Sequence, residues 1–121
     1  MTKCCYLYHM LVDIFERLDG WITRANLEAA ADGLPAHPRC TIRVPGQMAL
    51  FEAAVPYTLA VTQDVDVYAD YSYAIQRQFE ALLETAGKVL DPHGAEVWMP
   101  NETEYRLVYD GVYVRGMIAE P

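Results

Sequence analysis

Basic residues are scarce in this chain, which carries 9 Lys and Arg against 17 Asp and Glu, for a formal net charge of −8. Binding to phosphate backbones rests on Lys and Arg, so this balance argues against a general affinity for DNA or RNA. A local basic patch stays compatible with it, because Arg39, Arg43, Arg106 and Arg115 all lie near predicted strands. The acidic excess itself suits solubility or metal binding.

Cysteines are few and long apolar runs are absent. The three cysteines, Cys4, Cys5 and Cys40, show no CxxC spacing, and we interpret them as reduced thiols. No apolar run approaches the roughly 20 residues that a membrane helix needs, and the N-terminus lacks the pattern of a secretory signal peptide. We therefore expect no membrane partner and a cytoplasmic location.

The length of 121 residues predicts a single domain. Within it, residues 1–36 are expected to form N-terminal helices and residues 37–121 an α/β core. Apolar residues recur at helical spacing up to Gly20, which predicts a first helix that stops there. A second, shorter helix is predicted over about 23–31, and Gly33 is expected to end it.

The rest of the chain predicts an α+β fold, a small mixed β-sheet packed by helices. Strands are predicted at 40–44, 61–69, 96–99, 104–109 and 112–118, and helices at 47–54 and about 75–86. Ser72 or Asp70 is expected to cap the start of the later helix and Gly87 its end. Asp110-Gly111 predicts a hairpin between the last two strands.

The final strand predicts association with a second copy of the chain. Its apolar residues would expose an apolar surface if nothing followed them, and a homo-oligomer would cover it. These residues are Val112, Tyr113, Val114, Met117 and Ile118.

Asp64 and Asp66 are the sharpest chemical feature. Two carboxylates at i and i+2 on a strand point to the same face, where their like charges repel. A hard divalent cation relieves that repulsion, and Mg²⁺ is typically held by one or two carboxylates together with substrate phosphates. The alternative is a strand whose outward face is simply acidic and hydrated.

A possible anion site precedes this acidic strand. Val44 ends a predicted strand, and Gly46 and Gln47 stand at a turn into a predicted helix. Such a turn offers free backbone N–H groups and the positive end of a helix dipole to an anion. An anion site beside a metal pair is the arrangement that nucleoside triphosphate chemistry requires.

These two motifs together resemble the nucleotidyltransferase superfamily. The residues that carry the resemblance are Gly46-Gln47-Met48-Ala49-Leu50 and Thr62-Gln63-Asp64-Val65-Asp66-Val67-Tyr68. The closest subgroup is that of the bacterial abortive-infection toxin-like nucleotidyltransferases, which often have a Gly-Gly-x-Ala-Leu turn and a Thr-x-Asp-x-Asp strand. The resemblance covers about residues 40–118, mainly in the order of the predicted helices and strands. It implies a role in a toxin–antitoxin system.

The resemblance implies a Mg²⁺-dependent or Mn²⁺-dependent transferase acting on a nucleoside triphosphate. Asp64 and Asp66 would hold the metal, and Gly46 and Gln47 would bind the β- and γ-phosphates. A third carboxylate on a later strand would activate the acceptor hydroxyl, and Glu104 is the candidate taken here, with Glu96 as the alternative.

The sequence also departs from the family pattern. Gln47 replaces a small residue, no Asp lies inside the strand after Glu104, and the chain stops where the family has a further helical region. A truncated or degenerate member is therefore the second hypothesis: a non-catalytic module of the same fold that binds a partner or dimerises. A third is an α+β interaction domain that is unrelated to nucleotides.

Overall fold

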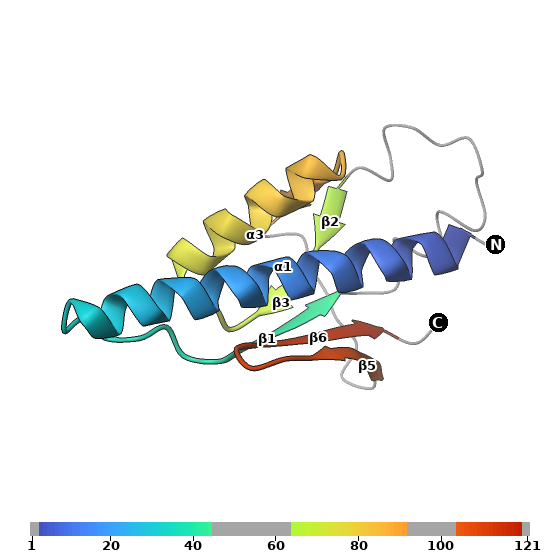
Figure 1. Cartoon of the computed structure of the whole chain (residues 1–121). Coiled ribbons are helices and arrows are strands. Elements are labelled where there is room, and N and C mark those ends of the chain that lie inside the picture. The colour runs from blue at the N-terminus through green and yellow to red at the C-terminus, as the bar shows by residue number, and fades with distance from the viewer. Residues whose placement is uncertain (1–2, 45–63, 92–103, 120–121) are drawn as a thin grey trace.

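The structure is a computed structural model, and it describes residues 3–44, 64–91 and 104–119. Helices α1 and α3 lie together on one side of the strands (Figure 1). The elements are α1 Lys3–Ala31, β1 Cys40–Val44, β2 Asp64–Asp66, β3 Tyr68–Ala69, α3 Tyr73–Thr85, β4 Val89–Asp91, β5 Tyr105–Asp110 and β6 Val114–Ala119. The predicted α+β fold with a mixed sheet packed by helices is confirmed.

The strands form two separate sheets in the described residues. A four-stranded mixed sheet has the order β3-β1-β6-β5, in which β1 is parallel to β6 while β3 and β5 are antiparallel to their neighbours. Strands β2 and β4 form a parallel pair of their own. Parallel strands need a crossover connection, and α3 lies in the chain between these two.

The N-terminal segment is one helix, so the predicted break at Gly20 is wrong. Helix α1 runs from Lys3 to Ala31, and its buried stripe continues through the glycine. Packing of this stripe outweighs the roughly 1 kcal/mol that a glycine costs inside a helix. The members of the stripe are Leu11, Ile14, Phe15, Leu18, Ile22 and Asn26.

The predicted stop after residue 31 is confirmed in its mechanism. Gly33 adopts a left-handed backbone with φ of 70°, and the amide of Leu34 donates to the carbonyl of Ala29 at 2.8 Å. This is the Schellman pattern that closes helices at glycine. Gly87, with φ of 75°, closes α3 in the same way.

Ser72 caps the start of α3. It is one of the two residues predicted for this role, the other being Asp70. Its hydroxyl accepts from the amide of Ile75 at 3.4 Å. The carboxylate of Asp70 instead accepts a hydrogen bond from the amide of Thr41 on β1 at 2.8 Å, which ties the end of β3 to its neighbouring strand. The apolar face of α3 is buried at Ile75, Phe79 and Leu83.

The segment predicted as one strand over 61–69 is two strands in two different sheets. Strand β2 pairs with β4, and β3 pairs with β1. Strand β4 itself was not predicted, because three residues are too few to show an alternating pattern. The predicted helix at 47–54 and strand at 96–99 lie outside the described residues.

The C-terminal hairpin is confirmed, with β5 and β6 antiparallel around Asp110-Gly111. The apolar surface expected on its last strand is mostly covered. Val114 is fully buried, and Tyr113 and Ile118 pack against the core, whereas Val112 is 70% exposed. Homo-oligomerisation therefore stays a prediction, and an exposed apolar surface on the last strand does not support it. In the described part of the chain, neither helix has the length and apolarity needed to cross a bilayer.

Candidate functional site

The predicted acidic pair lies on the short parallel ladder of β2 and β4. In its register, Asp64 is opposite Val89, Val65 is opposite Leu90, and Asp66 is opposite Asp91. Residues directly opposite in a ladder share a face of the sheet. The register therefore places positions 64, 66 and 91 on one face, two on one strand and one on its neighbour.

That face is turned away from the hydrophobic core. Val65 and Leu90 are buried at 0% and 4% exposure and belong to the core cluster, so they mark the inner face. On the outer face, Val89 is 51% exposed and Asp66 is half-buried. The exposure of Val89 and Asp66 thus shows that this face of the ladder is turned toward solvent.

Asp91 is the residue that sequence reasoning missed. The candidates for a third carboxylate that the sequence indicates, Glu96 and Glu104, lie on or beside strands predicted later in the chain. The signal that could have found it is the Gly87 helix stop followed by Val89-Leu90-Asp91, two apolar residues and an acid at the start of a new strand. Only the pairing of β4 with β2 brings this acid next to the acidic pair.

Glu104 stands in a different part of the molecule. It is exposed and directly precedes β5, an outer strand of the four-stranded sheet, whereas Asp66 belongs to the two-stranded ladder. The strand that pairs with β2 is β4. Gly46, Gln47 and Glu96 lie outside the described residues.

The described side chains form no metal-binding cluster. Among the side chains that the structure describes, no three His, Cys, Asp or Glu lie close enough together to hold a metal ion. The side chains of Asp64 and Asp91 are not among those described. The candidate site therefore rests on the backbone register and on residue chemistry.

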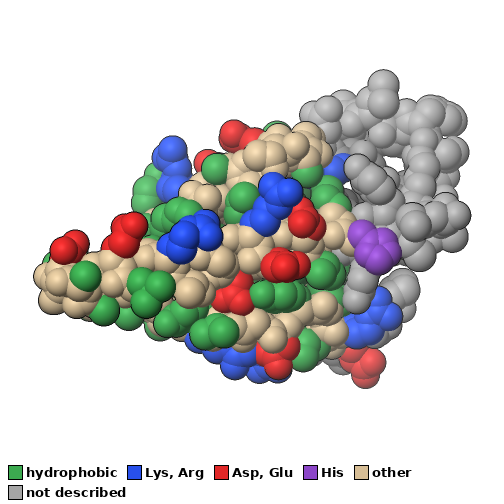
Figure 2. Space-filling model, viewed as in Figure 1, with side chains coloured by type: hydrophobic (Ala, Val, Ile, Leu, Met, Phe, Trp, Pro, Cys, Tyr) green, Lys and Arg blue, Asp and Glu red, His purple; other side chains and the backbone are tan. Residues whose placement is uncertain are grey.

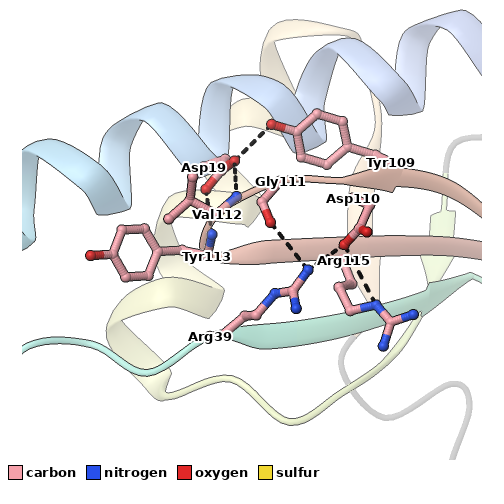
Figure 3. Close-up of polar contacts among 8 residues, drawn as sticks. All are labelled: Asp19, Arg39, Tyr109, Asp110, Gly111, Val112, Tyr113 and Arg115. Carbon is pink, nitrogen blue, oxygen red and sulfur yellow. Dashed lines mark hydrogen bonds and ion pairs between the residues drawn. The ribbon is translucent and has the colours of Figure 1, made fainter.

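A second polar cluster is centred on Asp19, which is 6% exposed in the middle of α1. Its carboxylate accepts from the Tyr109 hydroxyl at 2.7 Å and from the backbone amides of Val112 and Tyr113 at 3.0 and 2.8 Å. Figure 3 shows how these bonds hold the β5–β6 turn to the helix. Every partner is part of the fold, so we interpret Asp19 as structural.

The pKa of Tyr109 fits this interpretation. Burial and the hydrogen bond to Asp19 raise it from 10.0 to about 12, since both favour the protonated phenol. Beyond the turn, Arg39 and Arg115 pair with Asp110 on the side of the sheet away from α1 (Figure 3).

Cys40 and Tyr71 are two further groups whose pKa values are raised. Burial raises the pKa of Cys40 to about 11, with smaller contributions from Asp70 and Asp19. Burial also raises the pKa of Tyr71, whose hydroxyl has no hydrogen-bond partner in the described structure. A thiol held in its neutral form is a poor nucleophile. These observations favour a packing role for Cys40.

Comparison of the chain with models of protein families, with curated proteins and with solved structures finds no match in any of the three.

Proposed function

We propose that this protein is a metal-dependent nucleotidyltransferase in which Asp64, Asp66 and Asp91 hold Mg²⁺ or Mn²⁺. The observation that carries the proposal is the register of the β2–β4 ladder, with Asp66 opposite Asp91 on the outer face. The resemblance of the turn and strand motifs to the nucleotidyltransferase superfamily supports the same reading. In place of Glu104, Asp91 takes the part of the third carboxylate.

The residues present fit such a cation chemically. Mg²⁺ prefers oxygen ligands and is commonly held by a few carboxylates and substrate phosphates. Three carboxylates on adjacent positions of two strands repel one another, and an outer face that they share gains stability from a bound cation. When bound, the cation would offset the charge of a triphosphate.

In this mechanism Asp64 and Asp66 would hold the cation, which would supply charge stabilisation at the α-phosphate of a nucleoside triphosphate. The Gly46-Gln47 turn expected from the sequence would offer backbone N–H groups to the β- and γ-phosphates. Asp91 accepts the proton of the acceptor hydroxyl as that oxygen attacks the α-phosphorus, and pyrophosphate leaves. Catalysis then rests on positioning and charge stabilisation.

The first test is thermal unfolding in Mg²⁺ and in Na⁺ at matched ionic strength. A ligand that binds only the folded state adds RT ln(1 + [L]/Kd), about 2.7 kcal/mol at a hundredfold excess. For a domain of this size, Tm should rise by several degrees in Mg²⁺. Screening of an acidic surface has the same effect in both salts at matched ionic strength. Equal shifts of Tm in Mg²⁺ and in Na⁺ would therefore contradict the metal site.

The second test separates a transferase from a non-catalytic module of the same fold. We expect incubation with Mg²⁺ and nucleoside triphosphates labelled at the α-phosphate to release pyrophosphate and to label an acceptor. The non-catalytic alternative predicts a Mg²⁺ shift in Tm with no transfer to any acceptor in a cell extract.

A further inference from the structure

The four-stranded sheet has one face that no described helix covers. Helices α1 and α3 lie on the other face, where Cys40, Ile42 and Val114 are buried (Figure 1). Side chains alternate along a strand, so Thr41 and Arg43 of β1 point away from the helices. We call this second surface the open face.

One cross-strand row on the open face spans the whole sheet. In the registers, Tyr68 of β3 is opposite Arg43 of β1, Arg43 is opposite Met117 of β6, and Met117 is opposite Leu107 of β5. Neighbouring strands are about 4.8 Å apart, so four of them span about 14 Å. Arg43 is exposed, Leu107 is 40% exposed, and Tyr68 and Met117 are half-buried.

A second tyrosine lies on the same face, in the neighbouring row. Tyr105 is opposite Ala119, on the same face as Leu107. Burial raises the pKa of Tyr105; the charge of Arg43 lowers it and Tyr68 raises it, each to a lesser extent. The open face therefore carries a tyrosine on each of its two edge strands, with Arg43 on a strand between them.

The open face carries three of the arginines of this acidic protein, Arg39, Arg43 and Arg115. Arg115 is opposite Thr41 in the next row, and Arg39 lies beside it (Figure 3). Both pair with Asp110, whereas Arg43 has no ion-pair partner among the described residues. Figure 2 shows Lys and Arg side chains along the lower margin of the molecule, below the long helix, with Asp and Glu side chains beside them.

This combination fits a ligand that offers flat bases together with phosphates. Tyrosine rings and guanidinium planes stack on bases, and stacking is tolerant of sequence. A strongly acidic peptide would need several unpaired cations, and of the three arginines on this face only Arg43 lacks an ion pair with a described residue. Stacking adds affinity without further positive charge, so the face favours a nucleic acid over a peptide.

We propose that the open face, centred on Tyr68, Arg43 and Tyr105, binds single-stranded nucleic acid. The proposal goes beyond the transferase function and does not depend on it, since the acidic ladder of β2 and β4 belongs to the other sheet. About 14 Å of sheet accommodates two or three bases, as on other four-stranded sheets that bind RNA.

The test is fluorescence anisotropy with labelled twelve-residue oligouridine, oligodeoxyuridine and a duplex of equal length, in EDTA to exclude metal effects. We expect a single strand to bind more tightly than the duplex, and the tighter of RNA and DNA identifies the preferred sugar. Arg43→Gln and Tyr68→Leu should each weaken binding about tenfold, which corresponds to about 1.4 kcal/mol. Arg77→Gln, on α3 with an exposed guanidinium, is the matched control and should change little.

The dependence of binding on salt and the competition by polyglutamate complete the test. With at most three arginines involved, the slope of log K against log salt should not exceed about 2 in magnitude. Circular dichroism melts of each variant verify folding, and Arg43→Gln removes only an exposed side chain. Absence of binding by both single strands, equal weakening by Arg43→Gln and Arg77→Gln, or displacement by polyglutamate as effective as by unlabelled strand would overturn the proposal.

Discussion

The aromatic ring of Phe15 on α1 occupies the space that a β-carbon at position 116 of β6 would take, and Gly116 leaves that space free. Phe15 is completely buried and stacks on Phe79 of α3, with ring centroids 6.2 Å apart. This contact is where the long helix, the second helix and the sheet meet. The φ angle of Gly116 is not positive, so its backbone conformation is open to other residues. Glycine is needed here because only a residue without a β-carbon lets the Phe15 ring come this close.

Gly116→Ala should therefore destabilise the protein, by about 2–3 kcal/mol, because a new methyl group must displace a buried ring in a packed core. Chemical denaturation measures the free energy of unfolding. In a Phe15→Leu background the same substitution should cost less, which a double-mutant cycle detects. Gly20→Ala is the control, since its β-carbon would meet only the tip of Arg24. It should stabilise the helix by roughly 0.5–1 kcal/mol.

Asp19→Ala should cost about 3 kcal/mol or more in unfolding free energy. It removes the acceptor of three hydrogen bonds and leaves the amides of Val112 and Tyr113 without their partner. Asp13→Ala, on the same helix, removes an exposed ion pair with Arg17 and should change stability by under about 1 kcal/mol. Similar losses from both variants would contradict the structural role of Asp19.

Stability should fall in alkali, and Tyr109 should contribute to the fall. Its pKa is about 12 in the folded protein against 10.0 ordinarily, so the folded state keeps a proton that the unfolded state loses. The resulting stabilisation is complete below pH 10 and disappears as the pH rises through 12. Urea denaturation at pH 8 and pH 11 checks this. The difference in stability between the parent and Tyr109→Phe should narrow at the higher pH, and a constant difference would count against the Asp19–Tyr109 bond.

The metal proposal makes a discriminating prediction about the third carboxylate. Asp91→Asn and Asp66→Asn should each abolish the rise in Tm caused by Mg²⁺, because an amide keeps the shape and loses the charge. Glu104→Gln should retain it, since Glu104 lies beside the other sheet. Differential scanning fluorimetry in Mg²⁺ and Na⁺ measures the effect. Loss of the shift in Glu104→Gln with retention in Asp91→Asn would restore the assignment made from the sequence.

Short-range signals in the sequence were enough for several elements. Ser72 caps α3, Gly33 and Gly87 close the two helices, and Asp110-Gly111 turns the hairpin. Each of these depends on the conformation of a few adjacent residues, which residue type largely determines. The Gly20 prediction was wrong because burial along a whole helix outweighed the preference of one glycine.

The sequence by itself determined the α+β class, the bounds of β1 and the acidic character of the Asp64–Asp66 strand. Only the tertiary structure decided that the 61–69 segment divides between two sheets, that Asp91 lies opposite Asp66, and that Tyr68 and Arg43 share a row. Strand pairing joins segments that are distant in the chain, and its register follows from how their apolar faces meet in the core. No local pattern contains that information, so it appears only when the chain is folded.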